Sequence, residues 1–240
     1  MVQKTKSAGV LIIGNEILSG RTQDTNTAVI ARRLNTIGIA LHEVRVIPDI
    51  IDVITGNIRE FSKRFDYVFT TGGIGPTHDD KTAEAVAKAF DVDLVEDDEA
   101  LQRLIAHYGG RELLNDGRRK MALVPQGASL IDNPVSSAPG FKIGNVYVMA
   151  GVPKIMESML EFILPTLEGG AVIRSRSVTV QRAESKIADL LLAVEKAYDS
   201  VEVGSYPKYT YGQPEVTVIL SSVNEDELNR AYDDLLSRLQ

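Results

Sequence analysis

Short apolar runs alternate with helical patterns from the N-terminus to Pro165. The runs AGVLIIG, LHEVRVI and YVFTT each precede a stretch whose apolar residues recur every three or four positions. Strands that alternate with helices pair in parallel through right-handed crossovers, and helices then cover both faces of the sheet. The pattern predicts an α/β fold. The chain also looks helical from Asp97 to Leu123, and a further buried strand, VYVMA, follows.

The linker LPTLEGG separates this region from a second one with a different rhythm. SVTVQ, VEVGSY and EVTVILSS alternate like strands, and helical spacing of apolar residues runs through 187–197 and 228–239. The order βαββα predicts a small α+β domain built on its own antiparallel sheet. We therefore expect two domains, residues 1–170 and 171–240.

Composition excludes several classes of function. The 240 residues include 26 basic and 33 acidic side chains, a formal net charge of −7, and no cysteine. An acidic chain is a poor match for a broad nucleic-acid-binding face, and no apolar run approaches the roughly 20 residues that span a bilayer. The absence of cysteine is compatible with a reducing compartment and leaves only oxygen or imidazole as metal ligands. We expect a cytoplasmic protein that binds neither nucleic acid nor membranes.

The segment TTGGIGPTHDDKT joins the third apolar run to the next helical pattern. Glycines at such a junction present backbone N–H groups, which bind phosphate together with the positive end of the helix. The adjacent carboxylates of Asp79 and Asp80 would repel that phosphate. A divalent cation such as Mg²⁺ resolves the conflict, because it binds one or two carboxylates together with phosphate oxygens. The alternative is a plain strand-to-helix turn in which Asp79 or Asp80 caps the helix.

On the phosphate hypothesis, Asp80 is a metal ligand or general base. His78 is not predicted to be a ligand, because three consecutive side chains rarely point at one ion. The predicted substrate-binding residues of this loop are Thr71, Gly72, Gly73, Gly75, Thr77 and Thr82.

Two other strand ends should meet the same edge of the sheet, where ligands of parallel sheets bind. Asp49 follows the second strand, so it either caps the next helix or faces Asp80, one acid binding the cation and the other activating the nucleophile. The segment GNEILSGRTQDTN follows the first strand, and Asp24 or Thr25 should cap the helix after it. This segment supplies four further predicted binding residues, Gly14, Asn15, Glu16 and Asn26, with Glu16 also predicted as a metal ligand.

The loops NPVSSAPGF and AGVPK combine small residues, hydroxyls and proline, and they should form the far wall of a pocket. Pro153 is expected at the first helical position, which leaves Gly151 free to approach a ligand. The predicted binding residues of these loops are Ser136, Ser137, Gly140, Gly151 and Pro153.

Taken in this order, GNEILSG, DTN, VIPD, TTGGIGPTHDDKTAEA, NPVSSAPGF and GVP resemble the molybdopterin-binding domain of the MogA and MoaB proteins. The chain is particularly similar to the amino-terminal part of the CinA proteins, and from about residue 172 onward to their small KH-like middle domain. The resemblance implies a three-layer α/β/α fold, a pocket for a phosphorylated pterin or nucleotide, and a homo-oligomer, either a dimer or a trimer.

The resemblance also implies two reactions. In the MogA-like branch the family acids fall on Asp49 and Asp80 and are associated with Mg²⁺-dependent adenylyl transfer to molybdopterin. In the CinA branch the same domain is associated with metal-dependent hydrolysis of nucleotide pyrophosphates such as ADP-ribose. We expect hydrolysis, with Glu16 and Asn26 on the metal or the nucleoside side. Adenylyl transfer and a non-catalytic nucleotide- or pterin-binding module are the alternatives.

The chain departs from the usual CinA pattern in one respect, and its KH-like region departs from RNA-binding KH domains in another. CinA proteins usually continue into an amidase domain, whereas this chain ends at Gln240, so no deamidase activity is expected. The KH-like region lacks the G-x-x-G loop of RNA-binding KH domains, so a packing or pocket-lid role is expected in place of RNA binding.

Overall fold

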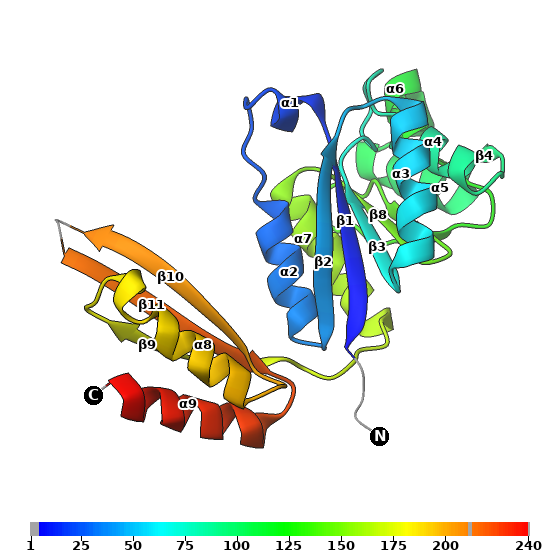
Figure 1. Ribbon diagram of the computed structural model, residues 1–240. Helices are drawn as coiled ribbons and strands as arrows, with labels where there is room; N and C mark the ends of the chain where they lie inside the picture. The colour runs from blue at the N-terminus through cyan, green and yellow to red at the C-terminus, as the bar shows by residue number, and fades with distance from the viewer. Residues whose placement is uncertain (1–4, 211–212, 240) are drawn as a thin grey trace. The chain divides into compact units, whose positions relative to one another are not determined.

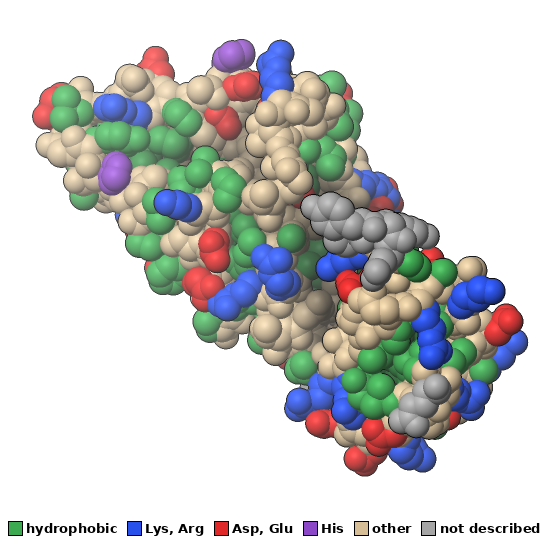
Figure 2. All heavy atoms as spheres, turned by 90° about the vertical axis from the view of Figure 1, so that its left-hand side faces the viewer, with side chains coloured by type: hydrophobic (Ala, Val, Ile, Leu, Met, Phe, Trp, Pro, Cys, Tyr) green, Lys and Arg blue, Asp and Glu red, His purple; other side chains and the backbone are tan. Residues whose placement is uncertain are grey.

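The computed structural model describes residues 5–210 and 213–239. The chain divides into two compact units, Met1–Gly170 and Ala171–Gln240. Within the described residues, none of the helices has both the length and the apolar composition that a membrane crossing needs. On the face drawn in Figure 2, basic and acidic side chains are interspersed, with hydrophobic side chains in small groups between them.

A mostly parallel sheet forms the centre of the first unit, as predicted (Figure 1). Its strands are β1 (Lys6–Ile13), β2 (Ile39–Ile47), β3 (Tyr67–Thr71), β6 (Ser129–Ile131), β7 (Gly140–Ile143) and β8 (Val146–Met149). Their order is β2-β1-β3-β8-β7-β6. The first four in this order run parallel, whereas β7 pairs antiparallel with both β8 and β6. The antiparallel edge arises because a tight turn, and no crossover helix, joins β7 to β8.

Helices cover both faces of this sheet, which gives the expected three layers (Figure 1). α2 (Asn26–Asn35) and α7 (Pro153–Ile163) pack on one face, and α3 (Ile51–Arg64) and α4 (Thr82–Ala89) on the other. Successive residues of a strand point to opposite faces. Accordingly, Val10 of β1 is buried in the cluster that includes α2 and α7, and Leu11 in the cluster that includes α3 and α4.

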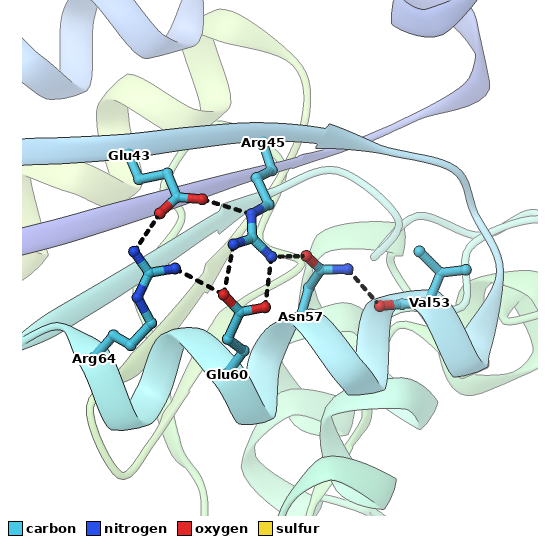
Figure 3. Close-up of polar contacts among 6 residues, drawn as sticks. All are labelled: Glu43, Arg45, Val53, Asn57, Glu60 and Arg64. Atoms are coloured by element: carbon cyan, nitrogen blue, oxygen red, sulfur yellow. Dashed lines mark hydrogen bonds and ion pairs between the residues drawn. The ribbon is translucent and has the colours of Figure 1, made fainter.

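Charged side chains hold α3 against the edge strand β2 (Figure 3). The Arg45 guanidinium donates to both carboxylate oxygens of Glu60, at 2.5 and 2.7 Å, and to Glu43 at 2.6 Å. Arg64 contacts the same two carboxylates, each at 2.7 Å. Hydrogen bonds from Arg45 and Arg64 lower the pKa of Glu60 to about 2. Each carboxylate of this network is therefore neutralised by a cation within the fold.

The segment between α4 and β6 is more varied than the helical stretch predicted for it. It contains the helices α5 (Asp98–Tyr108), η1 (Arg111–Leu113) and α6 (Asp116–Lys120). Two strands, β4 (Leu94–Glu96) and β5 (Leu123–Pro125), flank these helices and pair antiparallel in a separate small sheet. Strands of three residues are too short to show a periodicity in sequence, which is why they were missed.

The second unit has the predicted βαββα order and an antiparallel sheet. Its elements are β9 (Arg174–Val180), η3 (Glu184–Lys186), α8 (Ala188–Ala197), β10 (Glu202–Thr210), β11 (Gln213–Ser222) and α9 (Glu225–Leu239). The strand order is β10-β11-β9. Both helices pack on one face of this sheet through buried side chains such as Val194, Val218 and Leu235.

Candidate functional site

A cavity of about 660 Å³ opens at the carboxyl ends of the parallel strands. It lies where ligands of parallel sheets generally bind. Most of its wall comes from the ends of β1, β2, β3 and β8 and the segments that follow them, and the rest from residues between 108 and 138. Ten of the residues predicted from sequence line it: Glu16, Asp49, Gly72, Gly73, Gly75, Thr77, Asp80, Ser136, Gly151 and Pro153.

The glycine loop follows β3 and folds back on the first turn of α4. Thr82 closes it, because its hydroxyl donates to the Gly72 carbonyl and its N–H to the Gly73 carbonyl, each at 2.9 Å. Gly73 has a φ of +70°, and a Cβ there would lie 2.1 Å from the Thr82 hydroxyl. Only glycine fits this close approach without a shift in the backbone.

Three successive backbone N–H groups of the loop are available to a ligand. In residues 5–210 and 213–239, the amides of Gly73, Ile74 and Gly75 donate to no protein acceptor. The amide of Gly72, in contrast, donates to the Met149 carbonyl at 3.1 Å. Successive free amides in a glycine loop form a concavity that binds anions. This geometry suits a phosphate group.

Thr77 organises the acidic half of the loop. Its N–H and hydroxyl lie 2.8 and 2.6 Å from Asp80 Oδ2, and the hydroxyl also lies 2.6 Å from Asp79 Oδ1. The hydrogen bond from Thr77 lowers the pKa of Asp79, with a smaller effect from the Asp79 backbone. The expected alternative of a helix cap is wrong for both aspartates, because α4 follows Lys81 and receives no side-chain cap.

Lys120 brings a positive charge to this loop from α6. Its ammonium donates to the Thr77 carbonyl at 2.6 Å. The backbones also approach closely here, since a Cβ on Gly117 would lie 2.6 Å from the Pro76 carbonyl oxygen. Lys120 was not predicted from the sequence, because no motif marks a single lysine 43 positions away from its partner.

Asp49 connects two strand ends and does not cap α3. Its Oδ2 accepts a hydrogen bond from the Asn15 N–H at 2.8 Å, whereas α3 begins after Ile50 without a side-chain cap. The capping alternative for Asp49 is therefore also wrong. Asn15 starts the short helix α1 (Asn15–Leu18), and the exposed Glu16 follows it. Asp49 thereby fixes the segment that carries Glu16 at the cavity wall.

Asn26 lies beside a side cavity of about 60 Å³, which Thr71 and Glu16 also line. Its Nδ2 donates to the Gly151 carbonyl at 2.8 Å, while its buried Oδ1 has no partner among the described residues. The helix that begins at Asn26 is capped by Asp24, whose Oδ1 accepts from the Asn26 N–H at 2.9 Å. Asp24 is thus one of the two predicted caps, and Thr25 makes no such bond.

The remaining predicted residues lie outside the cavity wall. The N–H groups of Gly14 and Asn15 donate to the Ile47 carbonyl and to Asp49. Thr82 closes the glycine loop. Ser137 contacts His107 Nδ1 through its hydroxyl at 3.2 Å. Gly140 lies within β7, where a Cβ would come within 2.4 Å of the Val148 carbonyl oxygen, so close strand packing accounts for this glycine.

Several wall residues were not predicted as ligands. Asn133 belongs to a motif that was noticed, whereas Tyr108 and Met121 come from the segment between α4 and β6, which showed no motif. The wall residues without a sequence prediction are Ile13, Thr22, Ile74, Pro76, Asp79, Tyr108, Met121, Asn133, Ala138, Ala150, Val152 and Ile155.

Comparison with known proteins agrees with this architecture. Residues 9–169 match the family described as "Probable molybdopterin binding domain". The chain belongs to this molybdopterin-binding family. Residues 172–240 match a second family, described as "FAD synthase, middle domain".

Some relatives of this molybdopterin-binding-family protein extend over nearly its whole length. A protein from Archaeoglobus fulgidus is 38% identical over 231 residues, which cover 95% of this chain and 97% of that protein. The crystal structure of CinA from Thermoplasma acidophilum, a protein of unknown function, is 38% identical and has a TM-score of 0.64. The aligned region covers 68% of this chain and 98% of the CinA chain. The molybdopterin biosynthesis enzyme MoaB from Thermus thermophilus is 21% identical with a TM-score of 0.46, and covers 68% and 92% of the two chains.

The acidic side chains of the cavity do not form a ready-made metal cage among the described residues. Glu16, Asp49, Asp79 and Asp80 all line the cavity. In the described part of the chain, however, no three His, Cys, Asp or Glu side chains are grouped so that they could hold a metal ion. Mg²⁺ needs only one or two protein carboxylates when phosphate oxygens and water complete its shell. The carboxylates that line this cavity are the side chains that could supply such ligands.

Proposed function

We propose that this protein binds a nucleotide-like pyrophosphate and hydrolyses its phosphoanhydride with the help of a divalent cation. One observation carries the proposal: three acceptor-free amides of the glycine loop share a cavity with the carboxylates of Asp49 and Asp80. Carboxylates would repel a phosphate that the amides hold. A cation bound between the carboxylates and the phosphates removes this repulsion.

Each residue then has a separate task. The amides of Gly73, Ile74 and Gly75 hold the phosphate oxygens. Asp80, oriented by Thr77, is the cation ligand, and Asp49 accepts a proton from the attacking water. A bound divalent cation would neutralise charge on the phosphate oxygens. Water adds to one phosphorus, the anhydride P–O bond breaks, and two phosphate monoesters leave. ADP-ribose would give AMP and ribose phosphate.

The second candidate function is adenylyl transfer to molybdopterin. The family that residues 9–169 match supports it, because the description of that family names molybdopterin binding. The same amides and carboxylates would serve it, because it also breaks a phosphoanhydride. The two reactions differ in the nucleophile, which is a pterin phosphate in one and water in the other.

A mass-spectrometric assay separates these functions. Purified protein is incubated with Mg²⁺, Mn²⁺ or Co²⁺ and with ADP-ribose, FAD, NADH, or ATP plus molybdopterin. AMP formed without pterin and lost on chelation with EDTA is the expected result. Adenylylated molybdopterin without AMP from the other substrates would favour transfer. Thermal stabilisation by a ligand with no product under any metal would leave a binding module and overturn the catalytic proposal.

We also propose that the protein acts in the cytoplasm as a homodimer or homotrimer. The cysteine-free composition supports a reducing compartment, and the family resemblance supports self-association. Light scattering coupled to size-exclusion chromatography measures the mass directly. A single species at the 26.2 kDa of one chain would contradict the oligomer.

A further inference from the structure

A buried hydrogen-bond acceptor lies unused beside the cavity. Asn26 is only 6% exposed, and its Nδ2 donates to the Gly151 carbonyl at 2.8 Å. That bond fixes the orientation of the amide, so the other atom is the oxygen. Asn26 Oδ1 has no donor among the residues that the structure describes. A buried acceptor without a donor destabilises the fold, so such atoms are generally satisfied by a ligand or by water.

The side cavity that Asn26 lines is small, and its wall combines acceptors with hydroxyls and isoleucine side chains. The side cavity of about 60 Å³ is lined by Asn26, Glu16 and Gly151, and the last two also line the main cavity. A water molecule needs roughly 10–15 Å³ of such volume, so the side cavity has room for a few water-sized groups. That is enough for a pair of hydroxyls and too little for a heterocyclic ring system.

The charges of Glu16 and Asn26 limit which ligand groups could bind in the side cavity. Glu16 offers a carboxylate and Asn26 a neutral amide oxygen, both of which accept hydrogen bonds. A phosphate oxygen would be repelled by Glu16 and would bring no proton to Asn26. Two neighbouring hydroxyls supply one donor to each acceptor and carry no charge.

We propose that Asn26 Oδ1 and Glu16 bind the vicinal hydroxyls of a ribose in the ligand, next to the phosphate that the glycine loop holds. The inference rests on the proposed function, because it assigns the sugar of the same nucleotide. The competing occupant is a structural water that satisfies Asn26 in every state of the protein.

The test compares AMP with 2′-deoxy-AMP and 3′-deoxy-AMP by isothermal titration calorimetry. Mg²⁺ is included, because the proposed phosphate site needs a cation and AMP has no phosphoanhydride that could be hydrolysed. Loss of a hydroxyl leaves a buried acceptor unpaired, so each deoxynucleotide should bind at least tenfold more weakly than AMP. Equal affinities for AMP and both deoxynucleotides would overturn the proposal in favour of water.

Two variants test whether Asn26 and Glu16 cause the preference for AMP over the deoxynucleotides. Each of Asn26→Ala and Glu16→Ala should reduce to about twofold or less the preference for AMP over one deoxynucleotide, the one that lacks the hydroxyl bound by the substituted side chain. The preference over the other deoxynucleotide should remain. Glu16 is exposed, so its variant stays informative if loss of the Gly151 contact unfolds Asn26→Ala. Asn35→Ala, at the exposed far end of the same helix, is the matched control and should keep the full preference. A full preference over both deoxynucleotides in the Glu16 variant would also overturn the assignment.

The two proposals fail separately. If no substrate is hydrolysed but AMP is preferred over its deoxy forms, the ribose site stands and the catalytic function falls. If ADP-ribose is hydrolysed and the deoxynucleotides bind as well as AMP, the reverse holds.

Discussion

Carboxylates occur in two very different settings within the first unit. On the β2–α3 face, Glu43 and Glu60 both contact the guanidinium groups of Arg45 and Arg64 (Figure 3). In the cavity, Asp49 accepts from a backbone N–H and Asp80 from the N–H and hydroxyl of Thr77. Among residues 5–210 and 213–239, no lysine or arginine forms an ion pair with either cavity aspartate.

The difference separates carboxylates that support the fold from carboxylates that await a ligand. A guanidinium neutralises the charge of the carboxylate that it contacts, and its N–H groups occupy the acceptor positions of that carboxylate. Neutral donors such as an N–H or a hydroxyl orient a carboxylate but leave its charge in place. The cavity therefore keeps negative charge beside the glycine loop, as the proposed binding of a cation and a phosphate requires. Substitutions in the cavity should therefore change mainly activity, whereas substitutions in the β2–α3 network should change mainly stability.

The largest expected effect is on activity, in the neighbouring pair Asp80 and Asp79. Asp80→Asn should lower kcat/KM at least a hundredfold, because it removes the charge that binds the cation. Asp79→Asn is the matched control and should stay within about tenfold of wild type. Circular dichroism checks that both are folded. Full activity in a folded Asp80→Asn variant would remove Asp80 from the mechanism.

Gly73→Ala should disable the loop by shape alone. The residue has a φ of +70°, and the new Cβ would lie 2.1 Å from the Thr82 hydroxyl. We expect at least tenfold weaker binding of AMP, measured by calorimetry. Gly20→Ala is the control, since Gly20 has a φ of +72° but nothing within 4 Å of the added Cβ. Both should lose about 1–2 kcal/mol of stability from backbone strain, and only Gly73→Ala should lose the ligand. Equal AMP affinity in the two variants would contradict the role of loop closure.

Lys120→Met tests whether a cation within the chain supports the acidic loop. Its bond to the Thr77 carbonyl holds the turn that presents Asp80. We expect KM to rise about three- to tenfold with a smaller change in kcat, and Lys120→Arg to restore part of the loss. Lys63→Met, at an exposed position near the end of α3, should change neither constant. If the Arg and Met variants are equally impaired, the positive charge is not what matters at this position.

The sequence predicts the parts of this site that depend on local pattern. The parallel sheet follows from alternating strands and helices, and the cap by Asp24 involves residues only two and three positions away. The partner of Asp49 could not be predicted, because the Asn15 N–H lies 34 positions away and is brought close only by the pairing of β1 with β2. Lys120 was missed for the same reason. Local pattern predicts elements and their ends, whereas long-range packing decides which donor reaches which carboxylate.

Glu60→Gln should have the smallest effect, and on stability alone. Activity should be unchanged, because Glu60 lies in the β2–α3 network and does not line the cavity. The folded protein lowers the pKa of Glu60 from 4.5 to about 2. A lowered pKa contributes stability that is fully present above pH 4.5 and is lost as pH falls towards 2. The melting temperature of the variant should thus lie slightly below that of wild type at pH 7, as expected for an exposed ion pair, and the gap should close between pH 4.5 and 2. A gap that persists at pH 2 would show that Glu60 acts through packing and not through its charge.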